Sequence, residues 1–200
     1  MLFEAQIHDF KMWFPWFRIR REQGALRAVV EQQRRMMTPE EVAEQSAMII
    51  AQLEQMSAFR EAKTVLLYYP IHNEVDLRPL LTKYAGEKLF LLPVTHRHSM
   101  EVRPSDGEDM MRKGHFGVPE PQTATYKGAI DLILVPGVVF DHHRHRIGRG
   151  GGYYDKFLSR HLHAKKVGVC YSFQLKKHEI PHMIREPKMD RVVTPQLTIG

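Results

Sequence analysis

Apolar residues recur at helical spacing in the first part of the chain. The segment from residue 23 to residue 37 has a near-helical stripe made of Leu26, Val29, Val30 and Met37. The arginines of this segment, Arg34 among them, fall elsewhere on the expected helix. Thr38-Pro39-Glu40-Glu41 then supplies a threonine cap, a proline in the first turn and a glutamate three residues after the cap. We therefore expect one helix over 23–37 and a second from Pro39 to about residue 59.

Short apolar runs replace this pattern after residue 63. We expect strands at 64–69, 88–92, 130–135 and 167–171. The first is expected to be buried, and the run at 130–135 has no alternation, which predicts burial on both faces. A further strand is expected at 100–103, and helices over 76–84, with Asp76 as the cap, and over 151–162. Strands that alternate with helices along one chain favour a three-layer α/β domain with a largely parallel sheet flanked by helices.

The composition is that of one globular domain. The chain has 200 residues, of which 43% are hydrophobic and 26% charged. This length is enough for one compact core and too short for two comfortable ones. The longest apolar runs are far shorter than a membrane span. A single cysteine, Cys170, cannot form an internal disulfide, so we expect it in the core of a cytoplasmic protein.

The first twenty residues form a separate aromatic-rich segment. Charged residues and Pro15 interrupt its aromatics, so it has no continuous apolar region of the kind found in a signal peptide. We expect residues 1–20 to be an N-terminal extension that packs on the body or on a neighbouring chain, and residues 21–200 to be the domain. A disordered or mis-started leader is the alternative.

The net charge of +6 favours anionic partners, which include nucleic acids, phosphates and carboxylated small molecules. The segment Arg18–Arg35 makes a basic nucleic-acid-binding helix the rival interpretation. Glu22 and Glu31 interrupt this segment, and the chain has neither a helix-turn-helix nor an RRM pattern. We therefore expect no nucleic-acid partner.

A glycine-rich turn follows the expected strand at 130–135 and precedes the expected helix at 151–162. It consists of Gly148, Arg149, Gly150, Gly151 and Gly152. Without a Cβ, glycines let backbone amides approach an anion closely, and the start of the next helix adds its positive dipole. Arg146 and Arg149 add guanidinium groups suited to phosphate. The pattern is neither a Walker A loop nor GxGxxG. It predicts a phosphate site, and a mobile surface turn is the alternative.

Three side chains in the first turn of that helix extend the prediction. Asp155 would lie close to bound phosphates, where a carboxylate is favourable only if a cation lies between them, and this predicts a Mg²⁺ ion. The alternative is a carboxylate that only stabilises the helix N-terminus. Tyr153 and Tyr154 suit either stacking on a ring or core packing. We expect one of them to face the site, and the pattern does not show which.

A histidine cluster precedes the glycine turn. His142, His143 and His145 would suit a transition metal, but no acidic or cysteine partner stands at ligand spacing. We expect a solvated loop beside the phosphates.

Two stretches, VPGVVFD at 135–141 and RIGRGGGYYDKFL at 146–158, are similar to the motif of the 5-formyltetrahydrofolate cyclo-ligase family. The resemblance extends from about residue 23 to residue 194. Weaker elements follow in the family's order: LR with RRMMTPEE, YYPIHNEVD, GVPEP and MDRVVT. The resemblance implies a single Rossmann-like domain. It also implies ATP-dependent cyclisation of 5-formyltetrahydrofolate to 5,10-methenyltetrahydrofolate, with release of ADP and phosphate.

The resemblance also assigns roles to residues. Arg146, Arg149 and the amides of the glycine turn would offset charge on the γ-phosphate while the formyl oxygen attacks it. Tyr153 joins the two arginines as the expected catalytic set and would also contact the substrate. The further expected contacts are Arg27 and Tyr154 on ATP, Glu74 on the folate pterin, and Phe116 beside the substrate.

Two positions depart from the family pattern. Gln23 stands where the family usually has a lysine on ATP, so either a phosphate contact is lost or Arg20 or Arg21 supplies the charge instead. Glu186 stands where a second metal-binding aspartate is usual. These departures keep a non-catalytic nucleotide- or folate-binding relative as an alternative. We expect ATP, Mg²⁺ and a folate as ligands, no membrane partner, and a monomer or weak homodimer.

Overall fold

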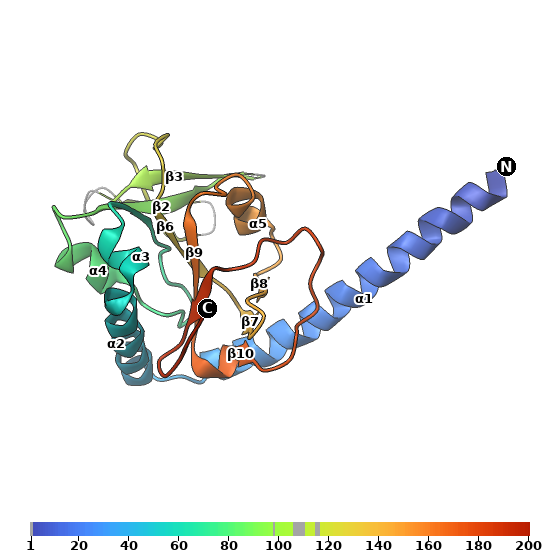
Figure 1. Ribbon diagram of the computed structural model, residues 1–200, viewed down its shortest axis with the longest axis horizontal. Helices are drawn as coiled ribbons and strands as arrows, with labels where there is room; N and C mark the ends of the chain where they lie inside the picture. Colours follow the sequence, from blue (N-terminus) through green and yellow to red (C-terminus); the bar gives the residue numbers. More distant parts are fainter. Residues whose placement is uncertain (1, 98, 106–110, 115–116) are drawn as a thin grey trace.

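The computed structural model describes residues 2–97, 99–105, 111–114 and 117–200, with side chains from residue 16 onward. Its centre is a seven-stranded sheet (Figure 1). In spatial order the strands are β12 (Thr198–Ile199), β11 (Arg191–Val193), β9 (Lys165–Val169), β6 (Leu132–Pro136), β1 (Thr64–Leu66), β2 (Leu89–Thr95) and β3 (Met100–Pro104). The five inner strands are parallel, and β12 and β3 join them antiparallel at the two edges.

Helices cover both faces of this sheet. The first face carries α2 (Pro39–Gln55), α3 (Ser57–Glu61) and α4 (Arg78–Lys83), and the second carries α5 (Tyr153–Leu158). Successive strand residues alternate between the faces: Val65 lies in one buried cluster with Leu53 of α2, and Leu66 lies in the other with Phe157 of α5. Both faces are therefore buried, which explains the unbroken apolar runs and confirms the mixed α/β class with a largely parallel sheet.

Two smaller sheets complete the fold. Strands β7 (Val139–Asp141), β8 (Arg146–Ile147) and β10 (Leu175–Lys176) form one, next to a short 3₁₀ helix at Ser172–Gln174. Strands β4 (Met111–Lys113) and β5 (Pro119–Pro121) form the other. The first of these sheets packs against α1 through a cluster that contains Val30, Val139 and Ile147.

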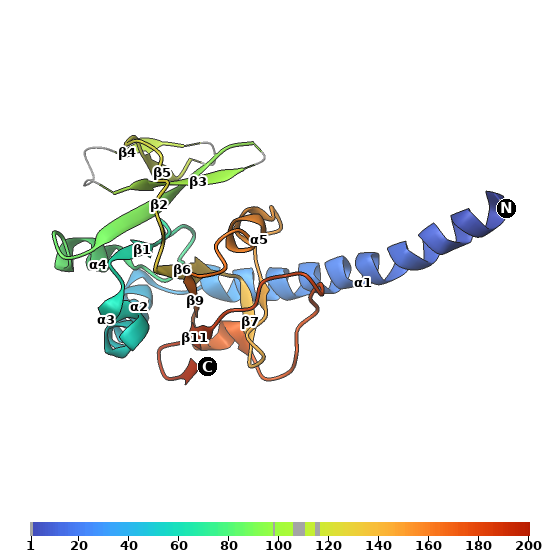
Figure 2. The same cartoon turned by 45° about the horizontal axis from the view of Figure 1, so that its top comes forward.

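Helix α1 is much longer than predicted and spans Leu2–Arg35 without a break. Its N-terminal half extends away from the body (Figures 1 and 2), so the expected packing of this segment on the body is wrong. The side chains of Trp16 and Phe17 are exposed. The proposed boundary at residue 20 falls inside the helix and stays a prediction, as does packing on a neighbouring chain. No helix among the described residues is long and apolar enough to cross a membrane.

The buried face of α1 also differs from the predicted apolar stripe. Val30 is fully buried, but Val29 is 56% exposed. Arg34, predicted off the stripe, is only 2% exposed. Gln23, Arg27, Val30 and Arg34 are three or four residues apart and so share one side of the helix. Leu26, Val30 and Met37 of the predicted stripe do pack into the body. Apolar spacing therefore found part of this face and missed its polar members, whose partners lie in the body.

Several boundaries differ from those predicted. The capping box at Thr38 is confirmed, but the helix that it starts ends at residue 55 because Met56 is extended, and α3 is separate. β1 ends at Leu66 and not at residue 69. β2 continues through Pro93 because β1 pairs only with residues 89–91. No hydrogen bond to β1 therefore requires a backbone N–H at position 93. Asp76 accepts from the amide of Arg78, but Leu77 is the N-cap of α4.

Candidate active site

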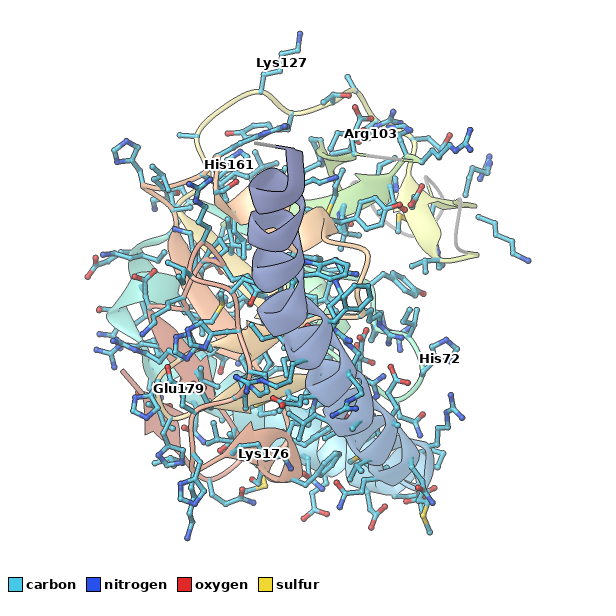
Figure 3. All side chains as sticks on the ribbon, turned by 90° about the vertical axis from the view of Figure 1, so that its right-hand side faces the viewer. His72, Arg103, Lys127, His161, Lys176 and Glu179 are labelled. Carbon is cyan, nitrogen blue, oxygen red and sulfur yellow. The ribbon has the colours of Figure 1, made fainter. Side chains whose placement is uncertain are left out.

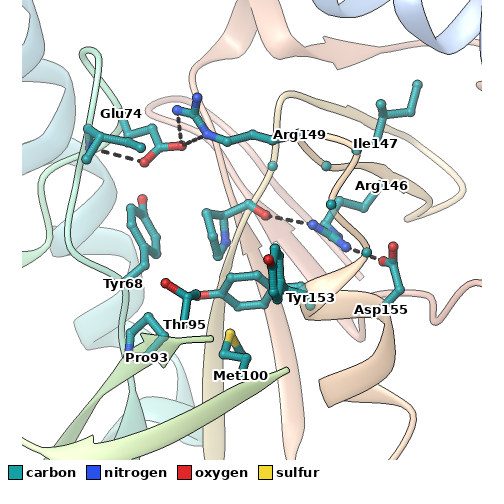
Figure 4. Close-up of a pocket in the computed structure, with 18 of the residues that line it drawn as sticks. Tyr68, Glu74, Pro93, Thr95, Met100, Arg146, Ile147, Arg149, Tyr153 and Asp155 are labelled. Carbon is teal, nitrogen blue, oxygen red and sulfur yellow. Dashed lines mark hydrogen bonds and ion pairs between the residues drawn. The ribbon is translucent and has the colours of Figure 1, made fainter. Parts of the chain in front are cut away.

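A cavity of about 570 Å³ lies at the carboxyl ends of β1, β2 and β6. Residues that follow or end these strands line it, among them Tyr68, Thr95 and Gly137. Helix α1, the glycine-rich turn, the start of α5 and the loop at 183–186 complete its wall. Open α/β sheets bind their ligands at the carboxyl ends of the strands, so the cavity has the position of an active site. Figure 4 shows its interior.

Each glycine of the turn between β8 and α5 is required for a structural reason. Gly150 and Gly152 have φ values of +98° and +68°, in the left-handed region that side chains disfavour. A Cβ on Gly148 would lie 2.8 Å from Nη1 of Arg146, and one on Gly151 would lie 2.8 Å from the ring of Tyr153. Gly152 is the N-cap of α5, and its cap position has no side-chain hydrogen bond. The turn therefore lines the cavity with backbone that carries no side chains at these four positions.

Arg146 and Asp155 form an ion pair on one wall of the cavity (Figure 4). Arg146 also donates to the carbonyl of Pro136, 3.1 Å away, which ties its guanidinium to the end of β6. The side chain of Arg146 is 5% exposed and that of Asp155 is 39% exposed. The carboxylate is thus accessible to a ligand, whereas the arginine is held in place by two fixed partners.

A second ion pair crosses the cavity between Glu74 and Arg149. Nη2 and Nε of Arg149 lie 2.8 and 3.2 Å from Oε1 of Glu74 (Figure 4). The other carboxylate oxygen accepts from the amide of Ile71 at 3.2 Å. His72 and Asn73, which lie between Ile71 and Glu74, have positive φ values, so the chain turns sharply just before Glu74. Glu74 is therefore held by its own turn and faces the glycine-rich turn.

Polar side chains connect helix α1 to the glycine-rich turn and to the loop at Pro181. Nε of Arg27 donates to the carbonyl of Gly148 at 2.6 Å, and Nη2 donates to Oε1 of Gln23 at 3.1 Å. Gln23 in turn donates to the carbonyl of Pro181 at 3.0 Å. Burial lowers the pKa of Arg27, which still stays protonated. Arg20, one turn earlier, lines the cavity as well.

Both tyrosines of α5 line the cavity, although only one was expected to do so. The hydroxyl of Tyr153 donates to the carbonyl of Arg97 at 3.2 Å. The hydroxyl of Tyr154 is buried and has no hydrogen-bond partner among the described residues. Burial raises the pKa of Tyr154, and the guanidinium of Arg146 lies 5.7 Å from its ring centre.

The remaining predicted residues divide into one that lines the cavity and one that cannot be placed. Glu186 lines it, and its Oε2 accepts from the amide of Met183 at 3.0 Å. Phe116 lies outside the described residues. Every other predicted site residue lies on the cavity wall: Gln23, Arg27, Glu74, Arg146, Gly148, Arg149, Gly150, Gly151, Gly152, Tyr153, Tyr154 and Asp155.

Sequence reasoning missed the wall opposite the glycine-rich turn. Tyr68, Pro93 and Met100 form an apolar surface there, beside Thr95 (Figure 4). The amide and hydroxyl of Thr95 both donate to Oε1 of Glu120, at 2.9 and 2.7 Å. The motif YYPIHNEVD contains Tyr68 and gave a signal for it. Thr95 and Met100 flank a stretch of the sequence whose pattern is too broken to read.

The histidine cluster has acidic neighbours that sequence spacing did not reveal. Buried His145 lies 3.1 Å from Asp141 and 3.8 Å from Glu179, and Glu179 lies 3.7 Å from His182. Figure 3 shows Glu179 on the opposite side of α1 from His72, which lines the cavity. The rings of His145 and His182 are stacked 3.6 Å apart at 13°. The lone pairs of the two rings therefore lie in nearly parallel planes and do not converge on one ion, so we assign no metal to this cluster.

Comparison with known proteins gives a consistent family. The model of the 5-formyltetrahydrofolate cyclo-ligase family matches residues 19–195. The probable 5-formyltetrahydrofolate cyclo-ligase of Schizosaccharomyces pombe is 29% identical, over 89% of this chain and 97% of its own. The Escherichia coli 5-formyltetrahydrofolate cyclo-ligase is 28% identical, over 84% and 97%.

Solved structures agree with this family. Aquifex aeolicus 5,10-methenyltetrahydrofolate synthetase has a TM-score of 0.79 and 33% identity, covering 88% of this chain and 91% of that one. The Mycoplasma pneumoniae 5,10-methenyltetrahydrofolate synthetase, at 23% identity and a TM-score of 0.69, shares the fold. The chain therefore belongs to the 5-formyltetrahydrofolate cyclo-ligase family, and its activity is that of an ATP-dependent ligase of folate one-carbon metabolism.

Proposed function

We propose that ATP and 5-formyltetrahydrofolate bind side by side in the 570 Å³ cavity, with the γ-phosphate between them. The observation that carries this proposal is that one cavity joins a phosphate-binding turn to an apolar wall with a carboxylate at its edge. The turn at 148–152 suits the triphosphate, and the wall of Tyr68, Pro93 and Met100 suits a flat ring system.

The nucleotide half of the site consists of the glycine-turn amides and the cations around them. Arg146 and Arg149 are placed to contact phosphate oxygens, and Tyr154 lies beneath Arg146. Arg27 already holds the carbonyl of Gly148, so it supports the turn as well as adding charge. Because Gln23 is neutral and bonded to Pro181, Arg20 is the cation that replaces the lysine usual in the family.

Asp155 is the residue best placed to hold Mg²⁺ beside the phosphates. Its carboxylate is 39% exposed, and Mg²⁺ usually combines one or two carboxylates with phosphate oxygens and water. Glu186 lines the same cavity and is the candidate for a second, more distant acid. The ion would also separate Asp155 from the phosphate charge, which would otherwise repel it.

The folate half is assigned to Glu74, Tyr153 and Phe116. A carboxylate accepts two hydrogen bonds from a ring with adjacent donors, as the pterin has. Glu74 is 9% exposed, so water competes little for such bonds. Tyr153 lies between this half and the glycine-rich turn and is placed to contact the reacting formyl group.

The proposed reaction needs alignment and charge compensation more than proton transfer. The formyl oxygen attacks the γ-phosphorus, an oxygen–phosphorus bond forms, and the bond to ADP breaks. The ten-position nitrogen then attacks the formyl carbon and loses its proton. The carbon–oxygen bond breaks, phosphate leaves with that oxygen, and the methenyl ring is closed. Arg146 and Arg149 would offset the charge that spreads over the γ-phosphoryl group.

Absorbance of the methenyl product tests this proposal directly. The purified chain with ATP, Mg²⁺ and 5-formyltetrahydrofolate should develop that absorbance. Asp155→Asn should lower the Mg²⁺-dependent rate about 10-fold or more. The matched control is Asp131→Asn, because the Asp131 carboxylate lies outside the cavity and accepts from the amides of Lys63 and Thr64. A fully active Asp155→Asn enzyme with unchanged Mg²⁺ dependence would remove the metal role.

We also propose that the protein works in the cytoplasm as a monomer or weak homodimer, without a nucleic-acid or membrane partner. Sedimentation equilibrium across a range of protein concentrations tests the oligomeric state.

A further inference from the structure

Arg34 of α1 is a buried cation that the proposed contacts leave unused. Its side chain is 2% exposed, and it is absent from the cavity wall. Its Nε and Nη1 atoms have no hydrogen-bond partner within the described part of the chain. The acid nearest to it is Glu74, whose Oε1 lies 3.7 Å from Nη1 of Arg34.

A guanidinium group in such a place requires compensation. Removing a cation from water costs several kcal/mol, on the order of the stability of a whole domain if nothing opposes it. Burial lowers the pKa of Arg34, and the charge of Glu74 is the largest contribution that opposes this shift. The position of Arg34 on α1 therefore makes Glu74 the acid that compensates its buried charge.

Glu74 thus has two arginines at the same carboxylate oxygen, and they differ in freedom. Arg149 lies in the glycine-rich turn, and its side chain is 38% exposed. Arg34 is enclosed, and its neighbour Val30 packs into the cluster that joins α1 to β7 and β8. A ligand phosphate can draw Arg149 away from Glu74, whereas Arg34 cannot leave.

We propose that Arg34 is a positioning residue for folate binding: it holds the Glu74 carboxylate in place after Arg149 has moved to the ATP phosphates. This inference rests on the proposed function, in which Glu74 accepts hydrogen bonds from the pterin. The 3.7 Å separation then shortens to a hydrogen bond when Arg149 leaves, and Oε1 keeps a cationic partner. Arg34 acts through Glu74 and touches neither ligand.

A positioning role for Arg34 changes the kinetics in a way that a general role in stability does not. Without Arg34, Glu74 would lose its only fixed cation whenever Arg149 binds ATP, and its carboxylate would stay with Arg149 or turn. Folate binding should therefore weaken, while ATP binding and the rate at saturation change little. A purely structural role would instead lower the melting temperature and the amount of active enzyme without changing either KM.

Three variants test this prediction by steady-state kinetics. Arg34→Met keeps the length of the side chain and removes its charge, and it should raise the KM for 5-formyltetrahydrofolate about 10-fold. Arg34→Lys should restore much of that loss, since it returns a cation to the same place. Arg35→Met is the matched control, because Arg35 is the adjacent exposed arginine and should behave as the native chain. The KM for ATP and kcat should stay within about twofold throughout.

Glu74→Gln distinguishes failure of this inference from failure of the proposed function. If Glu74→Gln leaves the folate KM unchanged, the placement of the folate is wrong. If Glu74→Gln raises it but Arg34→Met does not, only the role of Arg34 is overturned. In the double variant, Arg34→Met should add little to Glu74→Gln, and additive effects would also overturn it. If Arg34→Met does not fold, Arg34→Gln, which also removes the charge, is measured in the two Glu74 backgrounds and judged by the same criteria.

Discussion

At the scale of single residues, the glycine-rich turn shows why one residue type recurs in this site. Gly150 and Gly152 are needed for backbone conformation, whereas Gly148 and Gly151 are needed because Arg146 and Tyr153 occupy the space of a Cβ. At Gly150 and Gly152 there is room for a Cβ, but the positive φ disfavours any residue with a side chain. At Gly148 and Gly151 the backbone conformation is ordinary, but a Cβ would meet a neighbouring side chain. Substitutions in the two pairs should therefore fail for different physical reasons.

Gly152→Ala should destabilise the protein by about 1 to 2 kcal/mol, because alanine would have to take the left-handed conformation at φ +68°. The matched control is Gly24→Ala in α1. Gly24 is exposed in the helix interior, and nothing lies within 4 Å of its added Cβ. Alanine there should stabilise the protein by up to about 1 kcal/mol. Urea denaturation of both variants measures the two opposite signs, and equal effects would contradict the backbone argument.

Individual site residues were accessible from the sequence, but their pairings were not. The motif around residues 146–158 indicated Arg146, Arg149 and Asp155 as residues that bind ligands, and all three line one cavity. Nothing in the spacing indicated that Arg149 meets Glu74, 75 residues earlier, or that Arg34 lies behind that carboxylate. Such pairs depend on how α1 packs on the sheet, which the local pattern does not contain.

At the scale of elements, the sequence predicted where a helix starts better than it predicted which face of a helix is buried or where a strand ends. The capping box of α2 was predicted because its hydrogen bonds lie within four residues: Glu41 N donates to Thr38, and Thr38 N donates to Glu41. The buried face of α1 was predicted only in part, because the burial of Arg34 depends on Glu74, which is distant in the sequence. The predicted end of β2 was wrong because a proline ends a strand only where the neighbouring strand needs a hydrogen bond from that position, and β1 does not pair with Pro93.

Thr38→Ala tests the contribution of the capping box. The substitution removes the acceptor for the amide of Glu41 at 3.2 Å, so the free energy of unfolding should fall by about 1 kcal/mol. Thr38→Ser keeps that acceptor and should leave the free energy of unfolding nearly unchanged. Thermal unfolding followed by circular dichroism measures both. Because Thr38 is exposed and outside the cavity wall, a changed KM in either variant would contradict a purely local role.

At the scale of the whole molecule, the sheet brings the site together. The alternation of helices and buried strands predicted the layers, and the parallel order places Tyr68, Thr95 and Gly137 at one edge. The same order buries Cys170 directly after β9, where its amide donates to Val193 beside β9. Cys170 is fully buried, and its burial raises the pKa of the thiol. The only cysteine of the chain therefore reports on the integrity of the central sheet.

A thiol reagent at about pH 8 should react with Cys170 only through unfolding, because the folded state keeps the thiol enclosed and protonated. Denaturant should expose one thiol per chain. ATP with Mg²⁺ binds the folded state alone, so at a hundred times its Kd it should slow the reaction about 100-fold, equivalent to about 2.7 kcal/mol. Glutathione, treated in parallel, should show no such effect of ATP. Rapid labelling of the native protein would mean that the sheet opens locally at β9, and an ATP-independent rate would mean that nucleotide binding does not stabilise the fold.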